Sequence, residues 1–338
     1  MNILVAGGAG YIGTHTCVEL INAGHNVICA DNLLNSKYEA VKRVEKITGK
    51  EIKFYQVDLT DYAASRKVFE ENKIDGVIHF AGLKCVPESI SVPLKYYQNN
   101  IDSVFVIMQL MKEFNVKNFV FSSSATVYGD PKQLPITEES EVGGTTNPYG
   151  TTKYFIERIL MDICKADVSL NVAILRYFNP VGAHPSGLIG EDPNGIPNNL
   201  VPYVTQVAIG KRPYLNVNGN DYDTPDGTGV RDYIHVCDLA YGHVLALNKL
   251  ATNCGLVIYN LGTGKGNSVL EVVRAFDKAV GTPIPYKIAP RRPGDIAACY
   301  ADPTKASKEL GFVAKYNMDD MAKDAWNWQK NNPNGYDK

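Results

Sequence analysis

The sequence predicts an α/β protein with a Rossmann-type, doubly wound parallel sheet and a smaller C-terminal α/β domain. Three observations predict this class. Short apolar runs alternate with longer helix-like stretches over the first half of the chain, and a glycine-rich loop follows the first run directly. The runs are mostly continuous rather than alternating in polarity, as strands buried on both faces should be. Such strand–helix alternation gives parallel strands joined by right-handed crossovers.

The expected strands are short runs rich in β-forming residues, at positions 3–6, 27–30, 52–57, 77–80, 119–121 and 172–175. The expected helices lie between them, at positions 12–23, 38–48, 62–72, 91–114 and 149–164. Composition changes after Phe178, because segments 179–202 and 216–229 are dense in Pro, Gly and Asn, which is typical of functional loops. We therefore divide the chain into domains 1–180 and 181–338. Segments around 229–265 are candidates to return to the first domain.

The composition excludes several classes of function. The formal net charge of −2 provides no basic field for nucleic acid. The seven cysteines are scattered and contain no C-x-x-C pair, which argues against a disulfide framework and a zinc site, and favours a reducing compartment. The chain shows no signal-peptide pattern and no apolar run long enough for a bilayer. We expect a cytoplasmic protein with no metal and no membrane or nucleic-acid partner.

The loop after the first strand has the pattern of a dinucleotide site. It satisfies G-x-x-G-x-x-G through Gly7, Gly10 and Gly13, and G-x-G-x-x-G with Gly8 in place of Gly7. Glycine lets the backbone approach a pyrophosphate closely, and the following helix presents its N-terminal N–H groups to the anion. Taken alone, a plain tight turn is the competing explanation, but here a strand precedes the loop and a helix follows it.

Asp31 ends the second expected strand, where a carboxylate is placed to bind a ribose 2′-hydroxyl. A 2′-phosphate would be repelled there, so the sequence favours NAD over NADP. The alternative is that Asp31 only caps a loop. Asp58 ends the third strand and is a weaker candidate for the adenine end, because Asp is common in turns.

Tyr149 and Lys153 stand four residues apart, so on a helix both project from one face. A nearby ammonium favours the phenolate form of a tyrosine, and oxidised nicotinamide adds a second positive charge, so Tyr149 is a candidate base for a hydroxyl proton. Ser124 follows a strand expected at the cofactor edge and is a candidate to relay that proton or hold the substrate oxygen. The alternative is a chance Y-x-x-x-K on a solvated helix, which the other motifs make improbable.

These residues, in this order, resemble an extended short-chain dehydrogenase/reductase. Longer strings resemble, within it, the UDP-galactose 4-epimerase family, and they span essentially the whole chain. The strings are HFAGLK at 79–84, SSSATVYG at 122–129, RYFNPVGA at 176–183, GIPNNL at 195–200 and GVRDYIHV at 229–236. The resemblance implies an NAD-dependent isomerase that interconverts UDP-glucose and UDP-galactose through a 4-keto sugar. It also implies an NAD-binding domain at 1–180, a UDP-sugar-binding domain at 181–338, and a homodimer formed by helices 91–114 and 149–164.

The resemblance also assigns residues by matching positions. The catalytic residues are Tyr149, Lys153 and Ser124. The cofactor residues are Gly7, Gly10, Tyr11, Ile12, Gly13, Asp31, Asn32, Asn35, Ser36, Asp58, Leu59, Phe80, Ala81, Gly82, Lys84, Asn99, Ser122, Tyr149, Lys153 and Tyr177. The substrate residues are Lys84, Ser124, Tyr149, Phe178, Asn179, Asn199, Leu200, Asn216, Asn218, Arg231, Arg292, Asp295 and Cys299.

Two positions bear on substrate choice. Asn218 stands where the family commonly has an aromatic residue, which leaves stacking on uracil open. Cys299 stands where members restricted to plain hexoses carry tyrosine, so the resemblance implies that the N-acetylated UDP-hexosamines are also substrates. The alternative is a site closed by another side chain such as Tyr300.

Three other functions remain in view. A nucleotide-sugar 4,6-dehydratase needs an extra acid and base, and similar proteins with that activity carry an Asp-Glu pair directly after the position matching Ser124, where this chain has Ala125 and Thr126. A UDP-uronate 4-epimerase is harder to exclude on sequence. A non-catalytic NAD-sensing regulator has no use for the Tyr149/Lys153 pair.

Overall fold

The centre of the protein is a seven-stranded sheet in which every pair of neighbouring strands is parallel. The structure is a computed structural model that describes residues 1–195, 197, 199–292 and 294–337. The strand order is β10-β6-β5-β4-β1-β2-β3. The strands are β1 (Asn2–Ala6), β2 (Asn26–Asp31), β3 (Lys53–Gln56), β4 (Gly76–His79), β5 (Asn118–Ser124), β6 (Asn171–Tyr177) and β10 (Leu256–Leu261). The doubly wound α/β class is confirmed.

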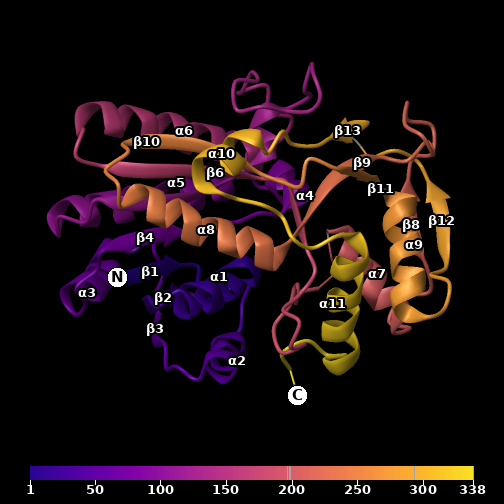
Figure 1. Ribbon diagram of the computed structural model, residues 1–338, viewed down its shortest axis with the longest axis horizontal. Helices are drawn as coiled ribbons and strands as arrows, with labels where there is room; N and C mark the ends of the chain where they lie inside the picture. Colours follow the sequence, from indigo (N-terminus) through magenta and orange to yellow (C-terminus); the bar gives the residue numbers. More distant parts are fainter. Residues whose placement is uncertain (196, 198, 293, 338) are drawn as a thin grey trace.

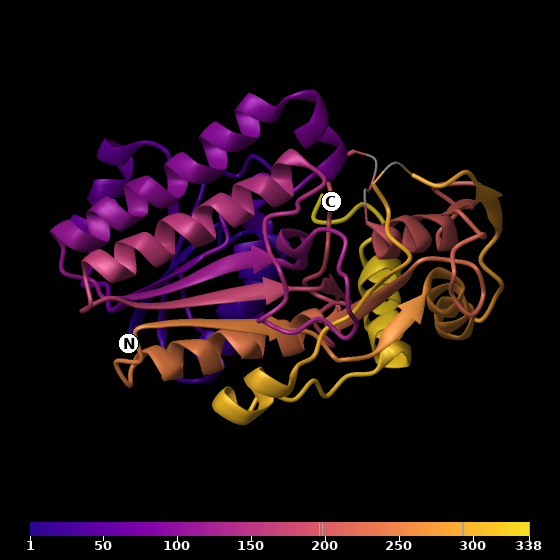
Figure 2. The same cartoon turned by 90° about the horizontal axis from the view of Figure 1, so that it is seen from above.

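Helices cover both faces of this sheet, so each face buries its own apolar core (Figures 1 and 2). One face carries α1 (Tyr11–Asn22), α2 (Tyr38–Thr48) and α8 (Val236–Leu250). The other carries α3 (Tyr62–Glu70), α5 (Pro93–Glu113) and α6 (Pro148–Ala166).

The helix expected at 91–114 is present as α5, and a separate short helix precedes it. The short α4 (Val86–Ser91) ends before α5 begins at Pro93, and Val92 between them has φ −133° and ψ 59°. A residue that precedes proline is pushed out of the helical region, which explains the break.

A second lobe holds smaller sheets and its own core. Its strands are β7 (Asn179–Val181), β8 (Leu215–Asn218), β9 (Val230–His235), β11 (Gly266–Ser268), β12 (Tyr286–Ala289) and β13 (Ala298–Cys299). Its helices are α7 (Leu200–Ala208), α9 (Val269–Val280) and α11 (Met318–Asn331), and their apolar side chains form one cluster with β8 and β9. The short α10 (Thr304–Leu310) contacts β10 and α8 instead.

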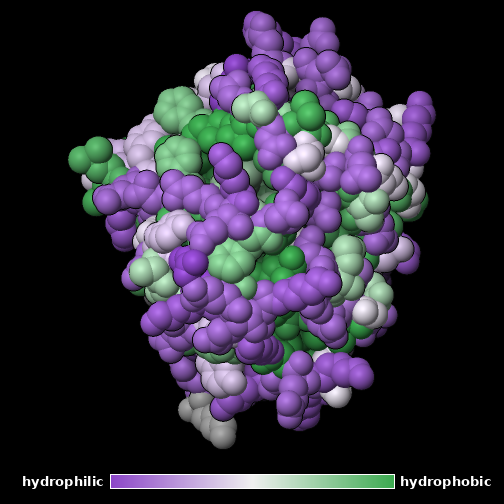
Figure 3. All heavy atoms as spheres, turned by 90° about the vertical axis from the view of Figure 1, so that its left-hand side faces the viewer, coloured by the Kyte–Doolittle hydropathy of each residue, from purple (hydrophilic) through white to green (hydrophobic). Residues whose placement is uncertain are grey.

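The chain crosses between the lobes more than once. After β9 it returns to the first lobe, where α8 packs on α1 and β10 pairs with β6. Because the strands of the large sheet are all parallel, their carboxyl ends lie at the same edge, and this edge faces the second lobe (Figure 2). Figure 3 looks at the opposite end, where hydrophilic side chains predominate and hydrophobic ones form separate patches. No helix among the described residues is long and apolar enough to cross a membrane.

Candidate active site

A cavity of about 660 Å³ lies where the strands of the large sheet end. Its wall includes residues near or just beyond the C-terminal ends of β1, β2, β4, β5 and β6, among them Gly10, Asp31, Phe80, Ser122 and Tyr177. The sheet order reverses between β1 and β4, and ligands of open α/β sheets bind beside such a reversal. The size and position are therefore those of a cofactor and substrate site.

The glycine loop is shaped for close backbone approach. Gly7 has φ +78°, and a Cβ on it would lie 2.7 Å from the Ala81 nitrogen. A Cβ on Gly13 would lie 2.4 Å from the Gly7 oxygen, so glycine is required where α1 packs on the loop. Gly10 differs, because its Cβ would meet only the Gly7 oxygen, at 3.3 Å. Gly10 lines the cavity at the start of α1, so the absent side chain leaves the helix N-terminus open to an anion.

Asp31 braces this loop and also faces the cavity. Its Oδ2 accepts a hydrogen bond from the Ala9 nitrogen at 3.1 Å, and its Oδ1 accepts from the Leu33 nitrogen at 2.9 Å and the Ser36 hydroxyl at 2.7 Å. Each carboxylate oxygen has two acceptor positions, so Oδ2 retains one for a ribose hydroxyl. Asp31 therefore does cap the loop, as the alternative interpretation expected, and it still has an acceptor position for a cofactor hydroxyl.

Tyr149, Lys153 and Ser124 all lie in the cavity wall. Tyr149 and Lys153 are on α6, whose N-cap Asn147 accepts a hydrogen bond from the Gly150 nitrogen at 2.9 Å. The buried Lys153 ammonium donates to the Ser122 carbonyl at 2.6 Å and lies 5.9 Å from the centre of the Tyr149 ring. The Ser124 hydroxyl donates to the Tyr149 oxygen. The three side chains thus lie side by side in one part of the cavity wall.

The expected lowering of the tyrosine pKa is not a property of these residues alone. Burial raises the pKa of Tyr149, and the hydrogen bond from Ser124 only opposes that shift. Burial also lowers the pKa of Lys153 to about 8, against the opposing charge of Glu157. The spacing of Tyr149 and Lys153 places an ammonium near the phenol, but it does not show how deeply the phenol is buried. Desolvation of the phenolate is the larger effect in the structure. A further positive charge in the cavity is needed to favour the phenolate.

A buried ion pair supports this group from behind. Arg176 on β6 donates to Glu157 on α6 through Nε at 3.0 Å and through a second nitrogen at 2.7 Å, and both side chains are essentially inaccessible. Ser123 donates to the same carboxylate at 2.5 Å, and Arg176 also donates to the Tyr128 hydroxyl at 2.9 Å. The pair ties α6 to the ends of β5 and β6, which fixes the position of Lys153.

On the second-lobe side, two arginines surround one carboxylate. Arg292 donates to Asp295 at 2.9 Å and 3.3 Å, and the Arg231 guanidinium lies 4.0 Å from the same group. Arg231 and Asp295 line the cavity, and Cys299 lies next to Arg231 across the β9–β13 pair. Guanidinium groups suit phosphate oxygens, so this edge is able to hold a diphosphate.

Glu191 is a second polar centre in the wall. Its Oε1 accepts from the Lys84 ammonium at 3.3 Å and from the Asn199 amide at 2.8 Å. Both partners were expected in the site, whereas Glu191 was not.

The cavity gathers the cofactor set completely and the substrate set in part. Every residue assigned to the cofactor by resemblance lies in its wall. Of the substrate set, Lys84, Ser124, Tyr149, Phe178, Asn179, Asn199, Arg231, Asp295 and Cys299 line it. Leu200, Asn216, Asn218 and Arg292 do not. Asn216 and Asn218 lie on β8, which pairs with β12. Ile196 and Asn198, which belong to the GIPNNL string, lie outside the described residues.

Sequence reasoning missed several wall residues. Thr126 is one of them, and its hydroxyl is buried without a hydrogen-bond partner among the described residues. Residues 190–194 and Tyr336 also line the cavity. The Pro-, Gly- and Asn-rich composition of 179–202 signalled a functional loop, but Tyr336 carried no signal. Among the described residues no cluster of His, Cys, Asp or Glu is able to hold a metal.

Comparison with known proteins gives consistent matches. The family model of GDP-mannose 4,6 dehydratase matches residues 4–325. A UDP-glucose 4-epimerase of Haemophilus influenzae is 62% identical over 336 residues, with 99% of each chain covered. The crystal structure of UDP-glucose 4-epimerase from Bifidobacterium longum in complex with NAD+ and UDP superposes with a TM-score of 0.96 at 60% identity, covering 99% of this chain and 100% of that one. A UDP-glucose 4-epimerase structure from Stenotrophomonas maltophila, with bound NAD and formylated UDP-arabinopyranose, has a TM-score of 0.96 at 48% identity, with 98% of each chain covered.

Proposed function

Because the chain belongs to the UDP-glucose 4-epimerase family, we propose that it interconverts UDP-glucose and UDP-galactose at C4 with bound NAD and with Tyr149 as the acid–base group. The observation that carries this proposal is that Tyr149, Lys153 and Ser124 share one cavity with the glycine loop and Asp31. That arrangement joins acid–base groups to a dinucleotide cradle.

The chain's residues divide the work as follows. When bound, NAD supplies the hydride acceptor and donor for C4 of the sugar. Tyr149 takes the proton of the 4-hydroxyl during oxidation and returns a proton when the 4-keto sugar is reduced on its other face. Ser124 donates to the tyrosine oxygen and so stabilises its ionised form. Arg231 holds the diphosphate and Asp295 the ribose hydroxyls of the nucleotide, so that the hexose is able to turn while UDP stays bound.

The dehydratase after which the matching family model is named fits less well. Ala125 and Thr126 follow Ser124 in the short helix η1 (Ala125–Tyr128), and neither provides an ionised carboxylate for removing water. UDP-uronates remain an alternative substrate class.

The test is to denature the purified protein, measure the NAD released, and assay the native protein on UDP-galactose and on a UDP-uronate. The proposal expects NAD in the supernatant and formation of UDP-glucose. If only the UDP-uronate is converted, the substrate is a UDP-uronate and not UDP-galactose. If the protein contains no NAD and has no epimerase activity, the proposal is wrong.

Asp31→Ala should weaken the preference for NAD over NADP. The change removes a ribose partner and a negative charge that opposes a 2′-phosphate, although it also removes the brace on Ala9 and Leu33. Asp31→Asn removes the charge but keeps one acceptor oxygen, enough for the bonds from Leu33 and Ser36, and serves as the matched variant. The measurement is the ratio of NAD to NADP affinity of cofactor-stripped protein, and an unchanged ratio in both variants would make Asp31 purely structural.

Cys299 is proposed as the residue that admits N-acetylated sugars. Its side chain lines the cavity beside Arg231, whereas Tyr300 is not part of the wall among the described residues. Cys299→Tyr adds a ring there, and overpacking a rigid site costs about 1–3 kcal/mol. We expect kcat/KM for UDP-N-acetylglucosamine to fall by about tenfold or more, and that for UDP-glucose to change little. An equal loss of kcat/KM on both sugars would show that Cys299 does not admit the N-acetyl group selectively. Absence of activity of the unmodified protein on UDP-N-acetylglucosamine would contradict the role as well.

A homodimer in the cytoplasm is proposed alongside the activity. Leu94, Phe105 and Phe155 are exposed apolar side chains on α5 and α6, helices that contact each other and present one face to solvent. Cys17, Cys29, Cys164, Cys237, Cys254 and Cys299 form no disulfide in the part of the chain that the structure describes, which suits a reducing compartment. Light scattering should give the mass of two chains, and Phe155→Glu should shift it toward one. A monomeric unmodified protein would contradict the dimer.

A further inference from the structure

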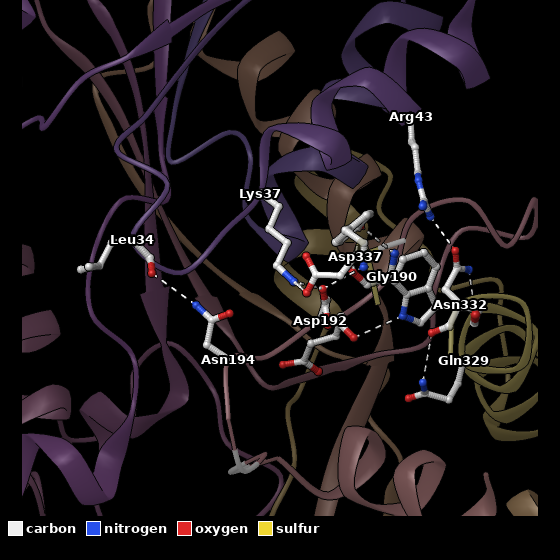
Figure 4. A network of polar contacts seen from close by, with 12 residues as sticks. Leu34, Lys37, Arg43, Gly190, Asp192, Asn194, Gln329, Asn332 and Asp337 are labelled. Carbon is white, nitrogen blue, oxygen red and sulfur yellow. Dashed lines mark hydrogen bonds and ion pairs between the residues drawn. The ribbon is translucent and has the colours of Figure 1, made fainter. Parts of the chain in front are cut away.

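One segment of the cavity wall is held from both lobes at once. We call residues 188–194 the strap. Gly190, Glu191, Asp192, Pro193 and Asn194 line the cavity, as do residues 34–37 on the facing side, which follow Asp31. Figure 4 shows the strap lying between the start of α2 and the C-terminal end of the chain. The strap therefore borders the part of the cavity where Asp31 would hold the ribose.

Polar contacts join the strap to the first lobe. Lys37 donates to Asp192 at 3.2 Å, and the Asn194 amide donates to the Leu34 carbonyl at 3.3 Å. Arg43 on α2 donates to the Leu188 carbonyl at 3.1 Å. These contacts span 145 to 160 residues of sequence, so they exist only in the folded chain.

Other contacts join the strap to the C-terminal region. The Tyr336 nitrogen donates to Asp192 at 3.0 Å, and the Tyr336 hydroxyl bonds the backbone of Gly190. Trp328 on α11 donates to the Glu191 carbonyl at 3.2 Å. A Cβ on Gly190 would lie 2.4 Å from the Trp328 ring, so this glycine allows the strap to lie against α11.

Lys37 is the point where the two sets of contacts meet. Its ammonium lies 3.2 Å from Asp192 and 2.5 Å from Asp337, near the end of the chain. Burial acts to lower the pKa of Lys37, but the hydrogen bonds to Asp337 and Asp192 outweigh it and raise the pKa. The lysine side chain is 29% exposed, so salt in solution reaches the cluster and weakens it.

We propose that Lys37, Asp192 and Asp337 are positioning residues that keep the strap closed over the cavity and so set how slowly NAD leaves. This inference rests on the proposed use of bound NAD. Epimerisation returns the cofactor to its starting state in each cycle, so the protein needs no route for rapid exchange. Release of NAD past Leu34 and Asn194 requires the strap to move away from α2, and the ion pairs of Lys37 oppose that motion. When a segment must open before a bound molecule can leave, the frequency of that local opening sets the rate of release.

The test compares Lys37→Met with Lys42→Met. Both changes remove one ammonium from the same region of the chain, but Lys42 is exposed on α2 and lies over the Tyr38 ring, 5.1 Å from its centre, away from the strap. Holoprotein is desalted, diluted into an NAD-capturing enzyme, and the NAD remaining per chain is followed with time. We expect Lys37→Met to release NAD about 3- to 10-fold faster, because the change removes two partly exposed ion pairs at once. Lys42→Met should match the unmodified protein.

Two further measurements distinguish a specific effect on NAD release from a general loss of protein stability. Asp337→Asn alters only an exposed partner and should speed release in the same direction with an unchanged melting temperature. Added salt should speed release from the unmodified protein but less so from Lys37→Met. Release that is the same in all variants and at all salt concentrations would overturn the proposal. The proposed function fails differently, because protein that retains NAD but converts no UDP-sugar would leave the strap result intact.

Discussion

Replacing Tyr149 by phenylalanine should lower turnover of UDP-galactose by about 10²- to 10⁴-fold while leaving the fold and NAD content intact. The ring fills the same space in the cavity wall, and only the oxygen that takes the 4-hydroxyl proton is lost. Ser124 loses its acceptor but keeps its hydrogen bond from the Thr126 nitrogen at 3.2 Å, so the end of β5 stays in place. The measurement is kcat beside bound NAD and the melting temperature.

Tyr154→Phe is the matched control for this change. Tyr154 lies on the same helix, one turn further on, and is not part of the cavity wall. Its variant should turn over substrate at the unmodified rate. Near-normal turnover in Tyr149→Phe would assign the acid–base step to another residue.

The largest expected effect on stability comes from Arg176→Leu. This change leaves the Glu157 carboxylate without its charged partner in the core, where breaking a buried pair costs about 3–5 kcal/mol. The double variant with Glu157→Leu removes both charges and should recover part of that loss. Denaturant unfolding of the unmodified protein, the two single variants and the double variant measures the coupling.

An exposed ion pair provides the comparison. Lys132 and Glu141 are 2.7 Å apart, with side chains 80% and 81% exposed. Lys132→Leu should leave the unfolding midpoint unchanged, because solvent screens such pairs. If Arg176→Leu were equally silent, the proposed support of α6 by this pair would be wrong.

The fold and the cofactor half of the site could be predicted because their signals are local. Each strand of the first half is a short apolar run that can be recognised in the sequence. Gly10 and Asp31 stand at characteristic sequence positions relative to these strands. The return of α8 and β10 to the large sheet is less visible, because it depends on which face each element packs against.

Long-range contacts were beyond prediction. Lys37 meets Asp192 and Asp337 across 155 and 300 residues, and no periodicity or motif connects them. The effect of burial on the pKa of Tyr149 could not be predicted for a related reason. The spacing to Lys153 is written in the sequence, whereas the burial that raises the pKa depends on the packing of the whole cavity wall.

The central claim is that C4 of the sugar is oxidised and reduced again inside one cavity. It is tested most directly by converting UDP-galactose that carries deuterium at C4, in ordinary water and without added NAD. The account predicts UDP-glucose with the deuterium still at C4 and unlabelled solvent. Loss of the label to water would contradict it, because the C4 hydrogen would then leave as a proton and no bound NAD would be required.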